Sequence, residues 1–156
     1  MLLGYSDSYL AGDPDGRKST SRVVFFLGNN IITWSSQKQK VVALSSCEAE
    51  YMAAGTAACQ GVWLSRLLGD LIGRAPAKFK LLVDNKSAIA LCKNPVHHDR
   101  SKHIDTKFHF IRDCIEEGQI DVDHVRTEEQ LADILTKALG YVRFNKLRRL
   151  LGVVKV

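Results

Sequence analysis

Four acidic residues, Asp7, Glu50, Asp84 and Asp133, stand at positions where apolar packing would otherwise continue. Asp7 and Asp84 each follow a short apolar stretch, whereas Glu50 and Asp133 lie in stretches with helical character. A buried carboxylate costs free energy unless a cation or a hydrogen-bond donor receives it. Four converging carboxylates would suit hard divalent cations, and such a site indicates phosphodiester chemistry. The competing explanation is surface charge or helix capping, and spacing alone leaves the two explanations even.

The elements that must position these residues change from strands to helices along the chain. Three strands joined by short turns are predicted over 3–9, 23–27 and 31–35, and together they form an antiparallel meander. The pattern then predicts a helix from Ser45 or Ser46 to about Ile72, strands over 79–83 and 120–125, and helices over 87–92, 104–117, 127–139 and 143–151. Strands that are separated by helices generally join in parallel. The fold class is therefore α/β, with a five-stranded mixed sheet flanked by helices.

This arrangement predicts how the four carboxylates meet. Asp7 and Asp84 are expected on neighbouring strands of the sheet. Glu50 and Asp133 are expected to reach in from helices on one side of it. Glu48 is the alternative to Glu50 as the site carboxylate of this helix. It lies near the opposite helix face, however, and suits a charge in the first turn.

Composition limits the classes of protein that this chain can represent. Its 156 residues suit one domain with a proper core, and no apolar run approaches the roughly 20 residues that span a bilayer. No signal peptide is evident, and the four widely spaced cysteines favour buried, reduced thiols. We therefore expect an intracellular protein without a membrane partner. A net charge of +5, with cations crowded in the middle and at the end, makes a polyanionic partner plausible.

The chain closely resembles the ribonuclease H domain of copia-type (Ty1/copia) retrotransposon polyproteins. The matching stretches follow the family's order over nearly the whole chain: 4–8, 11–13, 17–21, 43–46, 48–53, 84–85, 87–90, 94–95, 102–105, 108–112 and 127–137. The resemblance implies a ribonuclease H-like catalytic domain over 1–140. Residues 141–156 would form a basic helix that packs on or extends that domain.

The resemblance also implies a reaction and a set of site residues. The family's Asp, Glu, Asp, Asp pattern maps onto Asp7, Glu50, Asp84 and Asp133 as catalytic and metal-binding residues. They would bind two Mg²⁺ or Mn²⁺ ions and hydrolyse the RNA strand of an RNA–DNA hybrid during reverse transcription. Polar groups near the metals would contact the substrate: Ser45, Ser46, Asn85, Lys102 and His103. For the two serines and Asn85, helix capping and turn stabilisation are equally good explanations.

Partners and location follow from the same resemblance. An attached or associated reverse transcriptase polymerase domain is expected, in the cytoplasm within a virus-like particle or in the nucleus.

The chain departs from the family pattern at Tyr9-Leu10, at Arg22-Val23, where Gly-aromatic is common, and at Arg126, where Pro is usual. Each departure leaves the predicted ligands in place. Two alternative functions are a catalytically silent nucleic-acid-binding module with the same fold and a DNA-cleaving recombinase of the same superfold.

Overall fold

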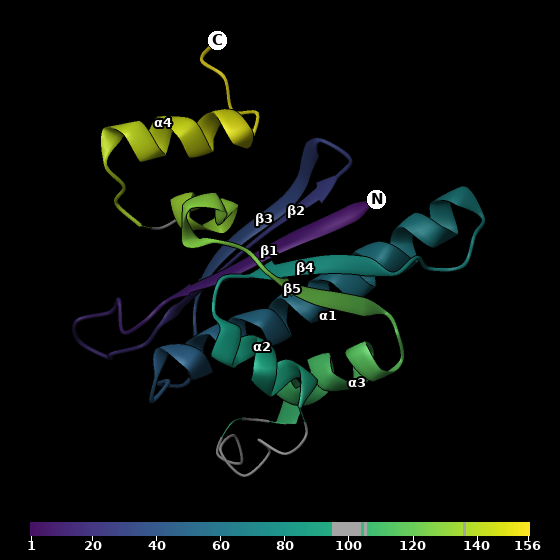
Figure 1. The fold of residues 1–156 in the computed structure, drawn as a ribbon, viewed down its shortest axis with the longest axis horizontal. Coiled ribbons are helices and arrows are strands. Elements are labelled where there is room, and N and C mark those ends of the chain that lie inside the picture. Colours follow the sequence, from purple (N-terminus) through teal and green to yellow (C-terminus); the bar gives the residue numbers. More distant parts are fainter. Residues whose placement is uncertain (95–103, 105, 136) are drawn as a thin grey trace.

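The computed structural model describes residues 1–94, 104, 106–135 and 137–156. Its sheet contains five strands in the order β3-β2-β1-β4-β5 (Figure 1). The strands are β1 (Leu2–Tyr9), β2 (Thr20–Leu27), β3 (Asn30–Lys38), β4 (Phe79–Val83) and β5 (Ile120–His124). The first three are antiparallel, and β4 and β5 join in parallel, so the predicted five-stranded mixed sheet is confirmed.

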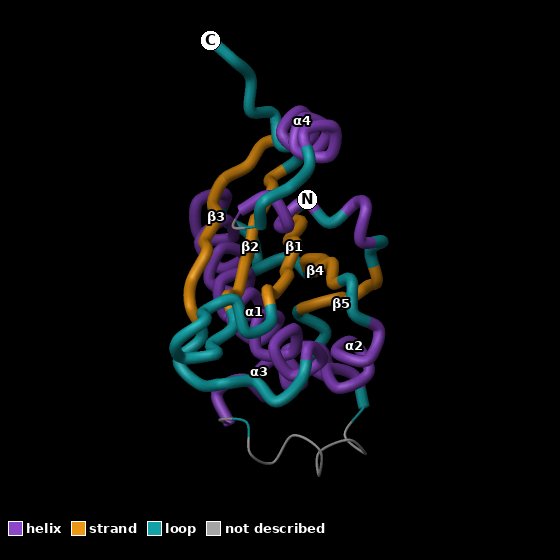
Figure 2. The backbone as a smooth tube through the Cα atoms, turned by 90° about the vertical axis from the view of Figure 1, so that its left-hand side faces the viewer, coloured by secondary structure: helices purple, strands orange, loops and turns teal. Residues whose placement is uncertain are grey.

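Helices of two kinds surround this sheet. The α-helices are α1 (Ser46–Ile72), α2 (Lys86–Lys93), α3 (Phe110–Glu116) and α4 (Tyr141–Leu150). The described residues also form three short 3₁₀ helices, η2 (Thr106–His109), η3 (Thr127–Glu129) and η4 (Leu131–Leu135). Figures 1 and 2 show α4 at the opposite end of the molecule from α2 and α3. No helix in the described part of the chain has both the length and the apolar character needed to cross a membrane.

Strand register places the first and third predicted carboxylates side by side. β1 pairs in parallel with β4, and Ser6 lies opposite Val83. Asp7 follows Ser6 and Asp84 follows Val83, so the two carboxylates are neighbours at the carboxyl ends of these parallel strands. This confirms the expectation that they lie on neighbouring strands. On its other side β1 pairs with β2, where Asp7 lies directly opposite Arg22.

Two apolar clusters pack on opposite faces of the sheet. Val23 and Phe25 of β2 belong to the large cluster that α1 completes. Val24 and Phe26 belong to a smaller cluster with residues of η4 and α4. Since successive strand residues point to opposite faces, α1 covers one face, and η4 and α4 cover the other. The prediction that Glu50 and Asp133 approach from one side is therefore wrong.

Close packing explains two glycines within α1. A Cβ on Gly61 would lie 2.2 Å from Cζ of Phe79, and one on Gly55 would lie 3.0 Å from the carbonyl oxygen of Phe108. A side chain at Gly61 would clash with Phe79, and one at Gly55 would be tightly crowded by the Phe108 backbone. The helix can therefore lie against β4 and the η2 segment, which brings its first turns close to β1.

The α-helix predicted over 127–139 is replaced by two 3₁₀ helices, η3 and η4. Gln130 is fully buried, and its amide donates to the Ser6 carbonyl oxygen at 2.9 Å, while its Oε1 accepts from the Ala132 N–H at 3.3 Å. The glutamine that the predicted capping box required is thus used to attach this segment to β1. The helix predicted over 104–117 is also shorter, because the described part begins as η2 before α3.

The cysteines are all free thiols, which agrees with the sequence prediction. Cys92 and Cys114 are buried as expected. Cys59 is exposed and Cys47 is only partly buried, so the prediction of burial is wrong for these two residues.

Leu147 provides a test of whether α4 folds together with the sheet. Its side chain is fully buried in the smaller cluster, whereas Leu150 on the same helix is 54% exposed. We expect Leu147→Ala to lower the free energy of unfolding by about 2–4 kcal/mol, because it leaves a cavity. Leu150→Ala is the matched control and should change it by less than about 0.5 kcal/mol. Urea denaturation measures both, and equal effects would contradict the packing of α4 on the domain.

Candidate metal centre

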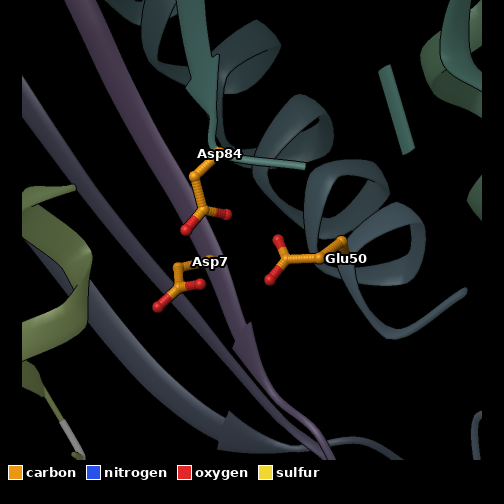
Figure 3. Close-up of side chains that lie close together, drawn as sticks. All are labelled: Asp7, Glu50 and Asp84. Atoms are coloured by element: carbon orange, nitrogen blue, oxygen red, sulfur yellow. The ribbon is translucent and has the colours of Figure 1, made fainter. Parts of the chain in front are cut away.

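Three of the four predicted carboxylates gather at one edge of the sheet. Asp7 lies near the end of β1, Asp84 directly follows β4, and Glu50 lies near the start of α1. One carboxylate oxygen from each residue lies within 4.8 Å of the others. Figure 3 shows the three side chains pointing toward one another, from β1, from the residue after β4 and from α1. The structure therefore brings together residues that are 43 and 34 positions apart in sequence.

The start of α1 is fixed by a reciprocal cap. The Ser45 hydroxyl accepts from the Glu48 N–H at 3.2 Å, and the Glu48 carboxylate accepts from the Leu44 N–H at 2.8 Å. Glu48 is therefore engaged at the cap. Glu50 lies about half a turn further on, where its Oε1 accepts from the Ser8 N–H at 3.0 Å and the Ser8 hydroxyl at 2.9 Å. These bonds join the helix to β1 beside Asp7.

Burial and mutual repulsion make the three carboxylates hard to ionise. Burial, followed by the charge of Asp84, raises the pKa of Glu50 to about 7, although hydrogen bonds from Ser8 oppose the shift. Burial also raises the pKa of Asp7, and the Glu50 charge raises it further, while Arg22 lowers it. Burial and the Asp133 charge raise the pKa of Asp84. A cation among them would relieve this repulsion.

The donor set fits a hard divalent ion. All three donors are carboxylates, which Mg²⁺ and Mn²⁺ accept readily. In addition, Oε2 of Glu50 is buried and has no hydrogen-bond partner among the described residues. A buried carboxylate oxygen of this kind is costly unless something receives it. A bound cation would supply that partner.

Asp133 lies outside the three-carboxylate group. It is buried on η4, and its carboxylate is surrounded by cations of the chain itself. Arg143 lies 2.6 Å from its Oδ2, Arg22 lies 3.3 Å from its Oδ1, and Lys137 lies 3.9 Å from Oδ1. Its charge nevertheless helps to raise the pKa of Asp84. The fourth predicted ligand is thus near the group but is already compensated.

Arg22 is the residue of this region whose role the sequence did not predict. It is 1% exposed, and it forms an ion pair with Asp7 while also pairing with Asp133. The sequence does contain a sign of this role, because Arg22 is a charged residue directly before the apolar run Val23-Val24-Phe25-Phe26 of the same strand. The sequence alone marks Arg22 only as a departure from the family pattern, and it places Arg143 only within a basic helix over 141–156.

The residues predicted to contact substrate stay predictions. Ser45 caps α1, and Asn85 caps α2 by accepting from the Ala88 N–H at 2.9 Å, so both have a structural role in addition to the predicted substrate contact. Ser46 is exposed at the first position of α1. Lys102 and His103 lie outside the described residues.

Comparison with known sequences finds retrotransposon polyproteins. The chain is 43% identical over 155 residues to the retrovirus-related Pol polyprotein from transposon RE2 of Arabidopsis thaliana, which covers 99% of the chain and 11% of that polyprotein. The Pol polyprotein from transposon TNT 1-94 of Nicotiana tabacum is 39% identical, covering 98% of the chain and 11% of its own length. The chain thus spans about a tenth of the length of these relatives. No protein-family model matches it.

Solved structures share the fold at low sequence identity. The N-terminal RNase H domain of a Mycobacterium tuberculosis protein has a TM-score of 0.57 at 13% identity, covering 95% of this chain and 96% of that one. An RNase H1 isolated from compost has a TM-score of 0.53 at 17% identity, covering 94% and 91%. The foamy viral protease-reverse transcriptase has a TM-score of 0.52 at 14% identity, covering 96% and 90%.

The raised pKa of Glu50 predicts how stability depends on pH. A carboxyl group with a raised folded-state pKa contributes stability that is fully present below its unfolded pKa, here about 4.5, and lost as the pH rises through about 7. Glu50→Gln removes this loss and keeps an oxygen for Ser8. Without metal, it should raise the free energy of unfolding at pH 8 by roughly 1–3 kcal/mol, with little change at pH 4.

Urea denaturation in EDTA at several pH values measures this effect. Glu48→Gln is the matched control, since it removes a carboxylate from the same turn but outside the cluster. It should keep the pH dependence of the wild type. If the free energy of unfolding of Glu50→Gln depended on pH in the same way as that of the wild type, the raised pKa of Glu50 would be contradicted.

Proposed function

Because the chain is an RNase H-like domain homologous over nearly its whole length to copia- and Ty1-type retrotransposon Pol polyproteins, we propose that it hydrolyses the RNA strand of RNA–DNA hybrids. The proposed reaction is metal-dependent and belongs to reverse transcription. The proposed ions are Mg²⁺ or Mn²⁺. The observation that carries the proposal is the buried group of Asp7, Glu50 and Asp84, whose carboxylate oxygens lie within 4.8 Å of one another.

The proposed roles of the chain's residues follow from their contacts. A divalent ion held by such carboxylates can activate a water and stabilise the leaving oxygen of a phosphodiester. Asp7, Glu50 and Asp84 would hold it, and each must be deprotonated to do so. Ser8 would orient Glu50 by binding its Oε1, which leaves Oε2 available to a ligand. Asp133 would act from outside this group through its charge.

The hybrid would be held by cations and by polar groups at the edge of the site. Lys146, Arg148 and Arg149 lie on α4, the helix that Arg143 attaches beside Asp133. Their positive charge suits a phosphate backbone. The ribose 2′-hydroxyl distinguishes RNA from DNA, and Asn85, next to Asp84, is the proposed residue that reads it. The proposed protein partner is a reverse transcriptase polymerase domain, because the sequence relatives are Pol polyproteins.

A silent nucleic-acid-binding module is the second candidate function. Arg22 favours it, because this arginine forms ion pairs with two of the four carboxylates, Asp7 and Asp133, from within the protein. The intact group of Asp7, Glu50 and Asp84 favours the enzyme. Catalysis therefore has to be measured separately from binding.

A labelled RNA–DNA hybrid incubated with Mg²⁺ separates the two functions. We expect the wild type to cleave the RNA strand, and Asp7→Asn or Glu50→Gln to reduce the rate by roughly a hundredfold or more, because each removes a metal ligand. Glu48→Gln, two residues from Glu50 and engaged at the cap, should keep the wild-type rate. Product formation is followed on a denaturing gel.

Two results would reject parts of this proposal. Binding of the hybrid without cleavage, at any Mg²⁺ or Mn²⁺ concentration, would leave the silent module. Cleavage that is insensitive to Asp7→Asn and Glu50→Gln would place the reaction at other residues. Binding of each variant is measured in parallel, so that loss of cleavage is not confused with loss of substrate.

A further inference from the structure

We propose that the guanidinium of Arg22 takes the place of a second divalent ion between Asp7 and Asp133, so that the free domain binds one divalent ion, on Asp7, Glu50 and Asp84. Arg22 is then a positioning and charge-balancing residue, because at 1% exposure it is too buried to touch a substrate. The inference deepens the proposed function, since it rests on the three carboxylates holding a metal ion.

Strand register places Arg22 at this point. It lies directly opposite Asp7 in the antiparallel pair of β1 and β2. Side chains of directly opposed residues project from the same face of a sheet and are close neighbours. Val24 and Phe26 on the same face pack against η4 and α4. Arg22 therefore continues this row toward η4, where Asp133 lies.

The contacts of Arg22 are those of a bridging cation. Its Nη2 pairs with Asp7 Oδ2 and donates to the Ser8 carbonyl oxygen at 3.1 Å. Its Nη1 donates to the carbonyl oxygen of Asp133 at 3.2 Å, and Nη2 lies 3.3 Å from Asp133 Oδ1. An arginine keeps its charge at all relevant pH values. It is thus a permanent cation joining the two carboxylates.

The surroundings of Asp133 disfavour a further cation. Arg143 and Lys137 also face this carboxylate, at 2.6 Å and 3.9 Å. These two side chains are 33% and 43% exposed, so solvent screens their charges, whereas Arg22 is buried. A divalent ion placed between Asp7 and Asp133 would have to displace this buried guanidinium, which is the main obstacle. Displacement would leave that guanidinium without its partners, at a high desolvation cost.

Asp7 can serve both cations at once. Arg22 engages Oδ2, and a carboxylate offers a second oxygen. Glu50 and Asp84 lie on the other side of Asp7. Among the described residues, neither of them forms an ion pair with a lysine or an arginine. This side is where the free negative charge accumulates, so it is where one ion binds.

Titration with MnCl₂ in the absence of nucleic acid tests the inference. Electron paramagnetic resonance distinguishes free from bound Mn²⁺, and a pair of adjacent bound ions gives a spin-coupled spectrum. We expect the wild type to bind one Mn²⁺ without coupling. Arg22→Ala should bind two with coupling, because Asp7 and Asp133 lose their shared cation. Arg66→Ala, which removes an exposed arginine away from the site, should bind one.

Asp133→Asn keeps the test decisive if Arg22→Ala does not fold. Under the proposal this variant still binds one Mn²⁺, whereas a two-ion site would lose an ion. Two coupled Mn²⁺ ions in the wild type would overturn the inference, and so would one ion in folded Arg22→Ala. One bound Mn²⁺ without hybrid cleavage would reject the proposed activity but uphold the inference. No bound Mn²⁺ in the wild type would reject both.

Discussion

The buried charge of Asp7 is the constraint on which the rest of the site depends. A carboxylate near the end of β1, flanked by Asp84 and Glu50, must be compensated from some direction. β2 supplies Arg22 because the antiparallel register puts it opposite Asp7. The same arginine also binds Asp133 and so attaches η4 to β2. Gln130, the residue before η4, donates to the Ser6 carbonyl oxygen and attaches the start of η4 to β1. One attachment is made by the cross-strand partner of Asp7 and the other by its neighbour Ser6, so charge balance and the position of this segment are linked.

Sequence patterns predicted the strands and most helices because each burial pattern is local. The strand over Phe79–Val83 alternates between buried and partly buried positions, and the α1 start has a serine cap with a glutamate in its first turn. The neighbouring placement of Asp7 and Asp84 followed from the rule that helix-separated strands join in parallel. The functional interpretation depended on the family resemblance, since the spacing of the carboxylates alone left two explanations even.

The errors arose where a side chain was used by a distant part of the chain. Thr127-Glu128-Glu129-Gln130 has the composition of a capping box, but Gln130 binds the carbonyl oxygen of a residue 124 positions away. Tertiary contacts of this kind override local propensity. The side from which Asp133 approaches could not be predicted either, because it depends on which face of the sheet η4 covers. That choice is visible only in the packing of Val24 and Phe26 with Leu131.

Two kinds of cation have different consequences for a group of buried carboxylates. An exchangeable metal ion compensates them only while it is bound, and its absence leaves raised pKa values such as that of Glu50. A built-in arginine compensates them permanently and cannot be lost to a chelator. By pairing Arg22 with Asp7 and Asp133, the chain fixes the geometry of β1, β2 and η4 without a metal. The remaining charge on Glu50 and Asp84 is left for an ion that can enter from solvent. Structural and chemical roles are thereby divided between the two sides of a single carboxylate.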